Sequence, residues 1–336
     1  MAGIETGKDS AAVPELPAAV RALAEADFSA VAARFAAAGF AVGEPAPGIL
    51  QVRAAAAGGR EQRAAVLLSV GVHGDETGPI EVLAHLLDAL SLQPAALAVD
   101  LMVCVGNLAA IRAGKRFIDA DLNRMFRSVR GPLAGAAEAA RADQMIAARA
   151  DFFRGSGPRR WHLDLHTAIR PSLYPTFAVV PDLIADEGKR ALTAWLGRAA
   201  IGAIILNPQS AGTYSYHTAE HHGAAAGTVE LGRVGALGRN DLAQFDDVAQ
   251  ALDHLLRGAH AAPARAMAAP HVFKVAQEII KLSDDFRMSF DRSTQNFTAL
   301  PAGAVIASDG ATVYTVRHAE ELVVFPNPDV RAGLRA

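Results

Sequence analysis

Short apolar runs of strand length alternate along this chain with segments whose apolar residues recur every three or four positions. The strand-like runs are residues 49–54, 64–70, 99–106, 160–167, 176–180, 203–208 and 227–232. The clearest helical patterns begin at residues 79, 136, 190 and 242. This alternation predicts an α/β fold with a largely parallel or mixed sheet flanked by helices.

The pattern changes beyond residue 262. Residues 262–271 have the composition of a linker, and the segments after them are short strands, with turns at Pro301-Ala302-Gly303 and Asp309-Gly310. At the other end, residues 18–40 carry one helical pattern. We therefore expect three parts. They are a partly helical N-terminal extension (1–44), an α/β catalytic domain (45–262) and a small β-rich C-terminal domain (263–336).

Composition and charge narrow the functional classes. The chain has 336 residues, 51% of them hydrophobic and 20% charged, which is enough for one large domain and a smaller one. Its net charge of -3 and pI near 6.4 offer no basic field for a nucleic acid. The single Cys104 stands in an apolar run, and no segment has the pattern of a signal peptide or a membrane span. We expect a cytoplasmic protein that binds neither nucleic acid nor membrane.

Polar residues follow two of the predicted buried strands. His73-Gly74-Asp75-Glu76 comes directly after the run 64–70, and His166 lies at the end of 160–167. A hydrolytic zinc site needs three protein ligands, commonly two histidines and one glutamate, with the fourth position left for water. Loops at the carboxyl ends of strands are where ligands gather in open α/β sheets. His73, Glu76 and His166 are therefore a candidate metal site, in which Gly74 lets the chain turn sharply.

The spacing His-x-x-Glu is weak evidence by itself, because a chain of this composition can contain it by chance. A second occurrence in the same chain is therefore a rival metal site. Residues 217–222, His-Thr-Ala-Glu-His-His, match the His-x-x-Glu-His spacing that marks one class of zinc peptidase when it lies on a helix. The surrounding residues are rich in Gly, Ser, Thr and Tyr and lack the apolar period of such a helix. We expect this cluster in a loop over the active site rather than at the metal.

Two further segments carry groups suited to catalysis. Arg116, Asn123 and Arg124 share one loop after the run 99–106, and arginine recognises carboxylates at two points or stabilises an oxyanion. Glu230 stands inside a short apolar strand, where desolvation raises the pKa of a carboxyl group toward the range of a general base. A surface loop with solvated arginines is the alternative for the first segment.

Four of these segments carry a family resemblance, in this order and at these separations: GVHGDETGPIEVL, GKRFIDADLNRMF, WHLDLHTAIR and TVELG. They resemble the succinylglutamate desuccinylase family, which belongs to the aspartoacylase group and is related to zinc carboxypeptidases. The likeness covers roughly residues 45–260, and the tail VVFPNPDVRAGLRA is also similar. It implies a zinc-carboxypeptidase-like catalytic domain that hydrolyses N-succinyl-L-glutamate to succinate and L-glutamate, the last step of the arginine succinyltransferase catabolic pathway.

The resemblance also implies a role for each residue at a matching position. One zinc ion per subunit would bind His73, Glu76 and His166, with Glu230 as the catalytic glutamate. Arg116 would polarise the scissile carbonyl, and Asn123 with Arg124 would hold the α-carboxylate of the substrate. The substrate carries three carboxylates, so Arg170 and Arg233, just past two of the motifs, are our candidates for the other two.

One position departs from the resemblance, and several alternatives stay open. Asp75 stands between two ligand positions where the family often has Asn, which makes the site more negative. The same groups could act on another N-acyl amino acid, such as an N-acetylated one, or serve a metallocarboxypeptidase or a non-catalytic zinc-binding protein. Related aspartoacylases suggest a homodimer. The expected partner is a small acyl amino acid substrate.

Overall fold

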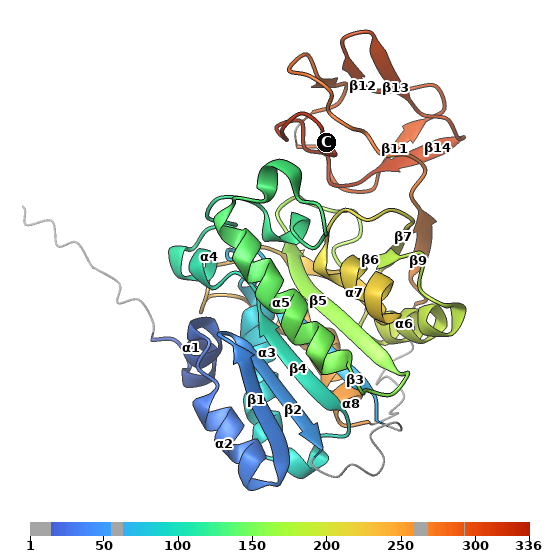
Figure 1. Ribbon diagram of the computed structural model, residues 1–336. Coiled ribbons are helices and arrows are strands. Elements are labelled where there is room, and N and C mark those ends of the chain that lie inside the picture. Colours follow the sequence, from blue (N-terminus) through green and yellow to red (C-terminus); the bar gives the residue numbers. More distant parts are fainter. Residues whose placement is uncertain (1–14, 55–62, 259–267, 292) are drawn as a thin grey trace, which may run out of the picture.

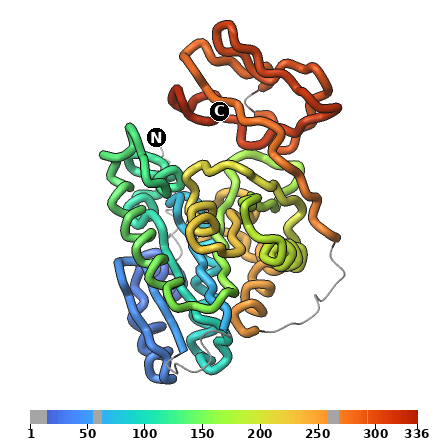
Figure 2. Tube along the Cα trace, turned by 45° about the vertical axis from the view of Figure 1, so that its right-hand side comes forward, coloured from blue at the N-terminus to red at the C-terminus, as the bar shows by residue number. Residues whose placement is uncertain are grey.

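The computed structural model describes residues 15–54, 63–258, 268–291 and 293–336 (Figure 1). The start of the N-terminal extension and most of the expected linker at 262–271 lie outside these ranges. Figure 2 shows two lobes, a large α/β lobe and a smaller C-terminal lobe at one end of it. No helix in the described ranges combines the length and the apolar composition that a membrane crossing requires.

A nine-stranded mixed sheet forms the centre of the large lobe, with the strand order β1-β2-β4-β3-β5-β8-β6-β7-β9. The strands are β1 (Phe40–Ala46), β2 (Ile49–Ala54), β3 (Ala65–Val70), β4 (Asp100–Val105), β5 (Arg160–Ala168), β6 (Phe177–Pro181), β7 (Ala203–Asn207), β8 (Ala225–Arg233) and β9 (His271–Lys274). Neighbours among β4, β3, β5 and β8 are parallel, whereas β6 pairs with β8 in the antiparallel direction. The expected mixed α/β architecture is confirmed.

Helices cover both faces of this sheet, which explains why β3 and β4 are buried along their whole length. The helices are α1 (Ala18–Glu25), α2 (Ser29–Ala37), α3 (Gly78–Ser91), α4 (Leu108–Ala113), α5 (Ala137–Phe153), α6 (Asp186–Arg198), α7 (Tyr214–His222) and α8 (Asp246–Leu256). Figure 1 shows α5 and α7 in front of the sheet and α3 behind it. One apolar core joins α3, α6 and α8 to the sheet, and a second lies between the sheet and α5.

The N-terminal segment differs from the single helix expected over 18–40. Two helices form, because Ala26 takes a left-handed conformation with φ 62° that ends α1. The Asp27 carboxylate then accepts a hydrogen bond from the Ser29 backbone N–H at 2.9 Å, where α2 begins. The strand β1 that follows continues across residue 45 into the central sheet, and β9 extends the same sheet beyond residue 262.

The C-terminal lobe is small and β-rich, as expected. It contains a three-stranded sheet of β10 (Arg287–Met288), β12 (Val305–Asp309) and β13 (Thr312–Thr315), and a pair made of β11 (Thr298–Pro301) and β14 (Glu320–Val323). Asp309-Gly310 connects the hairpin of β12 and β13, whereas Pro301-Ala302-Gly303 connects the two sheets. Asn296 joins this lobe to the loop after β5, since its backbone carbonyl accepts a hydrogen bond from the Leu173 N–H at 3.1 Å.

Candidate active site

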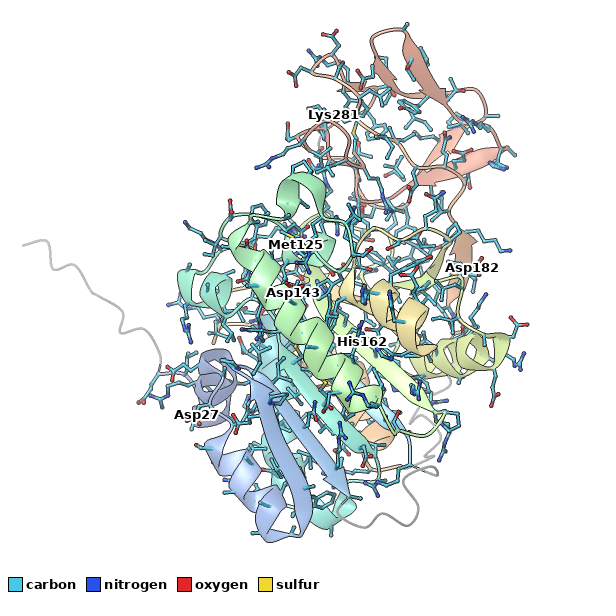
Figure 3. All side chains as sticks on the ribbon, in the orientation of Figure 1. Asp27, Met125, Asp143, His162, Asp182 and Lys281 are labelled. Atoms are coloured by element: carbon cyan, nitrogen blue, oxygen red, sulfur yellow. The ribbon has the colours of Figure 1, made fainter. Side chains whose placement is uncertain are left out.

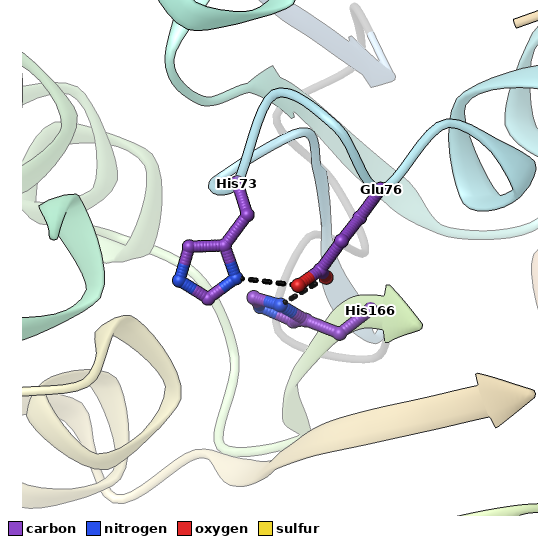
Figure 4. A group of neighbouring side chains, drawn as sticks. All are labelled: His73, Glu76 and His166. Atoms are coloured by element: carbon purple, nitrogen blue, oxygen red, sulfur yellow. Dashed lines mark hydrogen bonds and ion pairs between the residues drawn. The ribbon is translucent and has the colours of Figure 1, made fainter. Parts of the chain in front are cut away.

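Three buried ligand-type side chains meet at the carboxyl end of the parallel strands. His73 and Glu76 lie on the loop between β3 and α3, and His166 lies near the end of β5. One ligand atom from each residue lies within 4.8 Å of the other two. Nδ1 of His73 is 2.8 Å from Glu76 Oε1, and Nδ1 of His166 is 2.9 Å from Glu76 Oε2 (Figure 4). Within the described ranges this is the one group of three or more such residues with metal-binding geometry.

Gly74 lets the ligand loop approach its neighbour closely. A Cβ at this position would lie 2.3 Å from the backbone of Ala110 and Ile111 in α4, which no side chain could tolerate. The Gly74 N–H also donates a hydrogen bond to the Arg116 carbonyl oxygen at 3.1 Å. The backbone of Gly74 is not left-handed, so close approach to α4, rather than the sharp turn we expected, is the reason for glycine.

Each imidazole lies between two carboxylates. Nε2 of His73 is 3.0 Å from Asp121 Oδ1, and Nε2 of His166 is 3.0 Å from Asp164 Oδ2. The second contact is an ion pair in which the N–H is not aimed straight at the oxygen. Carboxylates behind metal-bound histidines commonly fix the ring orientation and leave the other nitrogen for the metal. This arrangement leaves both Nδ1 atoms facing Glu76.

The electrostatics of this group favour a cation. Burial alone would lower the pKa of His73 and His166, but the carboxylates around them outweigh burial and raise both pKa values. Burial would likewise raise the pKa of Glu76, yet the two histidines hold it well below its ordinary value. Two histidines and a glutamate are also the donor set of hydrolytic zinc sites. The residues present therefore fit a divalent metal ion.

Arg116 reaches the same group from the loop after α4. Its Nη1 donates a hydrogen bond to Glu76 Oε1 at 2.7 Å. Burial would lower the pKa of Arg116, but Glu76, Asp121 and Asp75 raise it, so the guanidinium stays charged. Asp75 Oδ1 is buried without a hydrogen-bond partner among the described residues, and the Asp75 charge is one of those that raise the pKa of Arg116.

Glu230 lies beside His166 on the adjacent parallel strand. The two residues are register partners of β8 and β5, which places them next to each other on the same face of the sheet. The Glu230 side chain is 7% exposed, and its Oε2 has no hydrogen-bond partner in the described part of the chain. Burial, followed by the nearby Glu76, raises the pKa of Glu230 to about 7. The carboxyl group is thus poised to exchange a proton near neutral pH.

Asn123 and Arg124 lie in the 3₁₀ turn Leu122–Arg124, next to the His73 partner Asp121. The buried Asn123 Oδ1 accepts a hydrogen bond from the Tyr214 backbone N–H at 2.9 Å, which leaves its amide N–H groups for a ligand. Nη1 of Arg124 donates to the Asn123 carbonyl oxygen at 2.8 Å and lies 3.8 Å from Asp121 Oδ2. The Arg124 side chain is 42% exposed and can meet a bound anion.

Arg170 and Arg233 lie at the same edge of the sheet as the metal ligands. Arg233 ends β8, where its register partner is Ala168, and Arg170 follows β5 by two residues. Arg170 is half-buried and Arg233 is exposed. Their assignment to substrate carboxylates stays a prediction.

The rival cluster at 217–222 lies in a helix, not in the loop we expected. α7 begins after Thr213, whose hydroxyl caps the Tyr216 N–H, and it ends at Gly223 with φ 61°. Its first six residues, Tyr214–Ala219, are all buried although most are polar, so the helix has no apolar stripe for a sequence pattern to reveal. His217 accepts a hydrogen bond from Arg149 at 2.6 Å and stacks on His221, away from the triad.

The sequence interpretation did not identify the carboxylates behind the two histidines. Asp164 precedes His166 by two residues on a strand, and this spacing places both side chains on one face. Asp121 precedes Asn123 by two residues in the same turn and accepts the Asn123 backbone N–H at 2.8 Å. The two-residue spacing of Asp164 and His166 could have been recognised in the sequence. The contact between Asp121 and His73 could not, because it depends on how the loop folds.

Comparisons with known proteins agree with this geometry. A family described as the succinylglutamate desuccinylase/aspartoacylase catalytic domain matches residues 62–256, and the AstE/AspA barrel-sandwich hybrid domain matches residues 268–336. A succinylglutamate desuccinylase from Burkholderia cenocepacia is 46% identical over 82% of this chain and 80% of its own length. One from Burkholderia lata is 44% identical over 86% and 82%.

Solved structures of similar proteins carry the same family name. The chain is similar to a succinylglutamate desuccinylase from Vibrio parahaemolyticus, with a TM-score of 0.80 and 31% identity over 89% of this chain and 87% of that one. It is also similar to the succinylglutamate desuccinylase from Chromobacterium violaceum, with a TM-score of 0.75 and 35% identity over 92% and 95%.

Proposed function

Because the chain belongs to the succinylglutamate desuccinylase/aspartoacylase family, we propose that it hydrolyses N-succinyl-L-glutamate to succinate and L-glutamate. The observation that carries the proposal is the register of β5 and β8, which sets Glu230 beside the ligand His166, with Glu230 Oε2 free of hydrogen bonds to any described residue. A base next to a buried group of two histidines and a glutamate is the arrangement that metal-assisted amide hydrolysis needs.

Zinc is the metal we propose for His73, Glu76 and His166, one ion per chain. When bound there, zinc makes a water molecule acidic and polarises the succinyl carbonyl. The carboxylates of Asp121 and Asp164 hold the two imidazoles so that both Nδ1 atoms face Glu76. Arg116 contacts the ligand Glu76 at 2.7 Å and so lies directly beside the proposed metal site.

Glu230 moves the protons in this proposal. Its carboxylate takes a proton from the attacking water and then delivers it to the nitrogen of the departing glutamate. The pKa of about 7 makes both transfers accessible near neutral pH. Arg116, one hydrogen bond from the ligand Glu76, shares the negative charge that develops on the carbonyl oxygen.

The substrate is anionic, and the cations near the site match it. Asn123 and Arg124 would hold the α-carboxylate of the glutamate part, with the Asn123 amide fixed by the start of α7. Arg170 and Arg233 at the same sheet edge are the proposed partners of the other carboxylates. We also propose a homodimer and a cytoplasmic location, the latter supported by the single, buried Cys104, which suits a reducing compartment.

A panel of acyl donors tests the proposed reaction. Purified protein loaded with zinc is incubated with N-succinyl-L-glutamate, N-acetyl-L-glutamate, N-acetyl-L-aspartate and a short peptide, and the free amine released is quantified. We expect the highest kcat/KM with N-succinyl-L-glutamate. A preference for an N-acetyl substrate would indicate a related deacylase, and cleavage of the peptide would indicate a carboxypeptidase.

A further inference from the structure

A continuous chain of buried polar side chains runs from the metal ligand His166 to α7. It begins at Asp164, whose Oδ1 accepts a hydrogen bond from the Ser69 hydroxyl at 2.5 Å. The Ser69 Oγ lies 2.8 Å from His162 Nε2, and His162 Nδ1 lies 2.9 Å from the Thr218 hydroxyl. Figure 3 labels His162, which lies on β5 between the sheet and the helices. Ser69, His162 and Thr218 are all fully buried.

The hydrogen bonds of this chain can be given one consistent direction. Burial lowers the pKa of His162 to about 3, so its ring carries a single proton. The Ser69 hydroxyl donates to Asp164 and therefore accepts its second hydrogen bond from His162 Nε2–H. Nδ1 is then an acceptor, so this direction requires that the one proton of the Thr218 hydroxyl goes to His162 Nδ1 and not to the Tyr214 carbonyl oxygen, which lies 2.9 Å from the same hydroxyl. With the Thr218 proton on His162, every donor of the chain points toward Asp164.

Arg149 of α5 stands at the far end of the chain. Its side chain is 1% exposed, and no ion pair joins it to a carboxylate in the part of the chain that the structure describes. Its Nη1 donates to the Thr218 hydroxyl at 3.3 Å and to His217 Nδ1 at 2.6 Å. A buried cation without an acidic partner is costly. The polar chain links it instead to the buried carboxylate of Asp164.

We propose that this chain, here named the buried relay, orients the Asp164 carboxylate against His166 and thereby presents His166 Nδ1 to the metal. The relay consists of Arg149, Thr218, His162 and Ser69. These are positioning residues, because none of them belongs to the ligand group. The inference rests on the metal centre of the proposed function.

The relay also gives a role to α7, the helix whose histidines were the rival metal site. Thr218 of α7 contacts His162, and the Tyr214 N–H at the start of the same helix holds Asn123. One helix thus supports a metal ligand through the relay and the substrate-binding turn through its first residue. Apolar neighbours such as Met102 and Cys104 fill the same face of the sheet, so polar residues are not required there for packing.

Zinc affinity tests the relay. Ser69→Ala removes the hydroxyl that aims Asp164. Loss of a group that directly supports a metal ligand typically weakens metal binding by about 10- to 100-fold, and this range is the upper bound for Ser69, which lies one hydrogen bond further from His166. The dissociation constant is measured by competition with a chromogenic chelator, and the cobalt-loaded protein gives a visible spectrum that reports ligand geometry. We expect weaker zinc binding and an altered cobalt spectrum.

Ser215→Ala is the matched control, since Ser215 is equally buried and its hydroxyl is 2.8 Å from Thr228 Oγ1, outside the relay. It should keep wild-type zinc affinity although it also loses a buried hydrogen bond. A second pair, Thr218→Val and Thr218→Ser, removes and restores the hydroxyl next to His162. Valine should weaken zinc binding in the same direction as Ser69→Ala, and serine should recover it. This pair decides the matter if Ser69→Ala does not fold.

The outcomes separate the relay from the proposed function. If the wild-type protein binds no zinc, the metal centre itself is wrong. If the wild-type protein binds zinc and both Ser69→Ala and Thr218→Val bind it as tightly, the relay is refuted. Equal weakening by Ser69→Ala and Ser215→Ala would also overturn it, because the effect would then be a general loss of packing.

Discussion

Replacement of Glu230 by Gln separates catalysis from metal binding. Glutamine keeps the size of the side chain but cannot take a proton, and loss of a general base typically lowers kcat by a factor of about 100 to 10,000. Glu230 does not belong to the ligand group of His73, Glu76 and His166, so the zinc content should stay at one ion per chain. Succinate release and elemental analysis of the same preparation measure the two quantities.

The burial of Glu230 predicts a second effect, on stability. The rise of its pKa from the ordinary 4.5 to about 7 corresponds to a cost of about 3 kcal/mol for the charged form in the folded protein. Below pH 4.5 the carboxyl group is protonated in both the folded and the unfolded protein, so the folded protein has its full stability. As the pH rises through about 7, the buried group must ionise or stay protonated at a cost, and this stability is lost. Metal-free Glu230→Gln should therefore be more stable than metal-free wild type at pH 8, by up to about 3 kcal/mol, and equally stable near pH 4.

Urea unfolding of both metal-free proteins at the two pH values measures this difference. Glu220→Gln, an exposed change in α7, is the control and should alter neither turnover nor stability. Near-normal turnover in Glu230→Gln would exclude Glu230 as the base. Loss of zinc from this variant would contradict the ligand assignment.

Four further predictions address separate parts of the site. His73→Ala should lose the metal, measured by elemental analysis, whereas Glu220→Ala in the rival motif should keep it; the reverse result would move the metal to α7. Arg116→Ala should lower kcat by about 100- to 1000-fold, and an unchanged kcat would remove it from the oxyanion. The kcat/KM of the zinc enzyme should fall as the pH drops, because Glu230 must be ionised, and bound zinc should place this limb at or below about pH 7; a rate that rises toward acid pH would contradict the role. Cys104 is fully buried with its pKa raised to about 12 by burial, so it should resist alkylation at pH 8 until the protein unfolds, as mass spectrometry would show.

Periodicity predicted the strands that build the site. The run that became β3 is a nearly continuous apolar segment of strand length, and His73 and Glu76 follow it where ligands gather in α/β folds. The run that became β5 alternates polar and apolar residues, and His166 lies near its end. The metal triad could be predicted because its residues stand next to strong strand signals. The pairing of His166 with Glu230 could not be predicted from the sequence pattern, because it depends on which strands become neighbours in the sheet.

α7 shows why a helix can escape a sequence interpretation. Its residues Tyr214–Ala219 are buried although most are polar, because Arg149, His162 and Asn123 satisfy them from other elements. Such partners come from distant parts of the chain, so the helix carries no local apolar period. The capping residues Thr213 and Gly223 were the signal that could have identified it.

Zinc-dependent release of succinate tests the central claim most directly. Protein stripped with a chelator is titrated with zinc, and the rate of succinate release from N-succinyl-L-glutamate is followed. We predict no turnover without metal and full recovery at one zinc ion per chain, the capacity of the His73, Glu76 and His166 group. Turnover by the stripped protein at the full rate, or no succinate release at saturating zinc, would contradict the account.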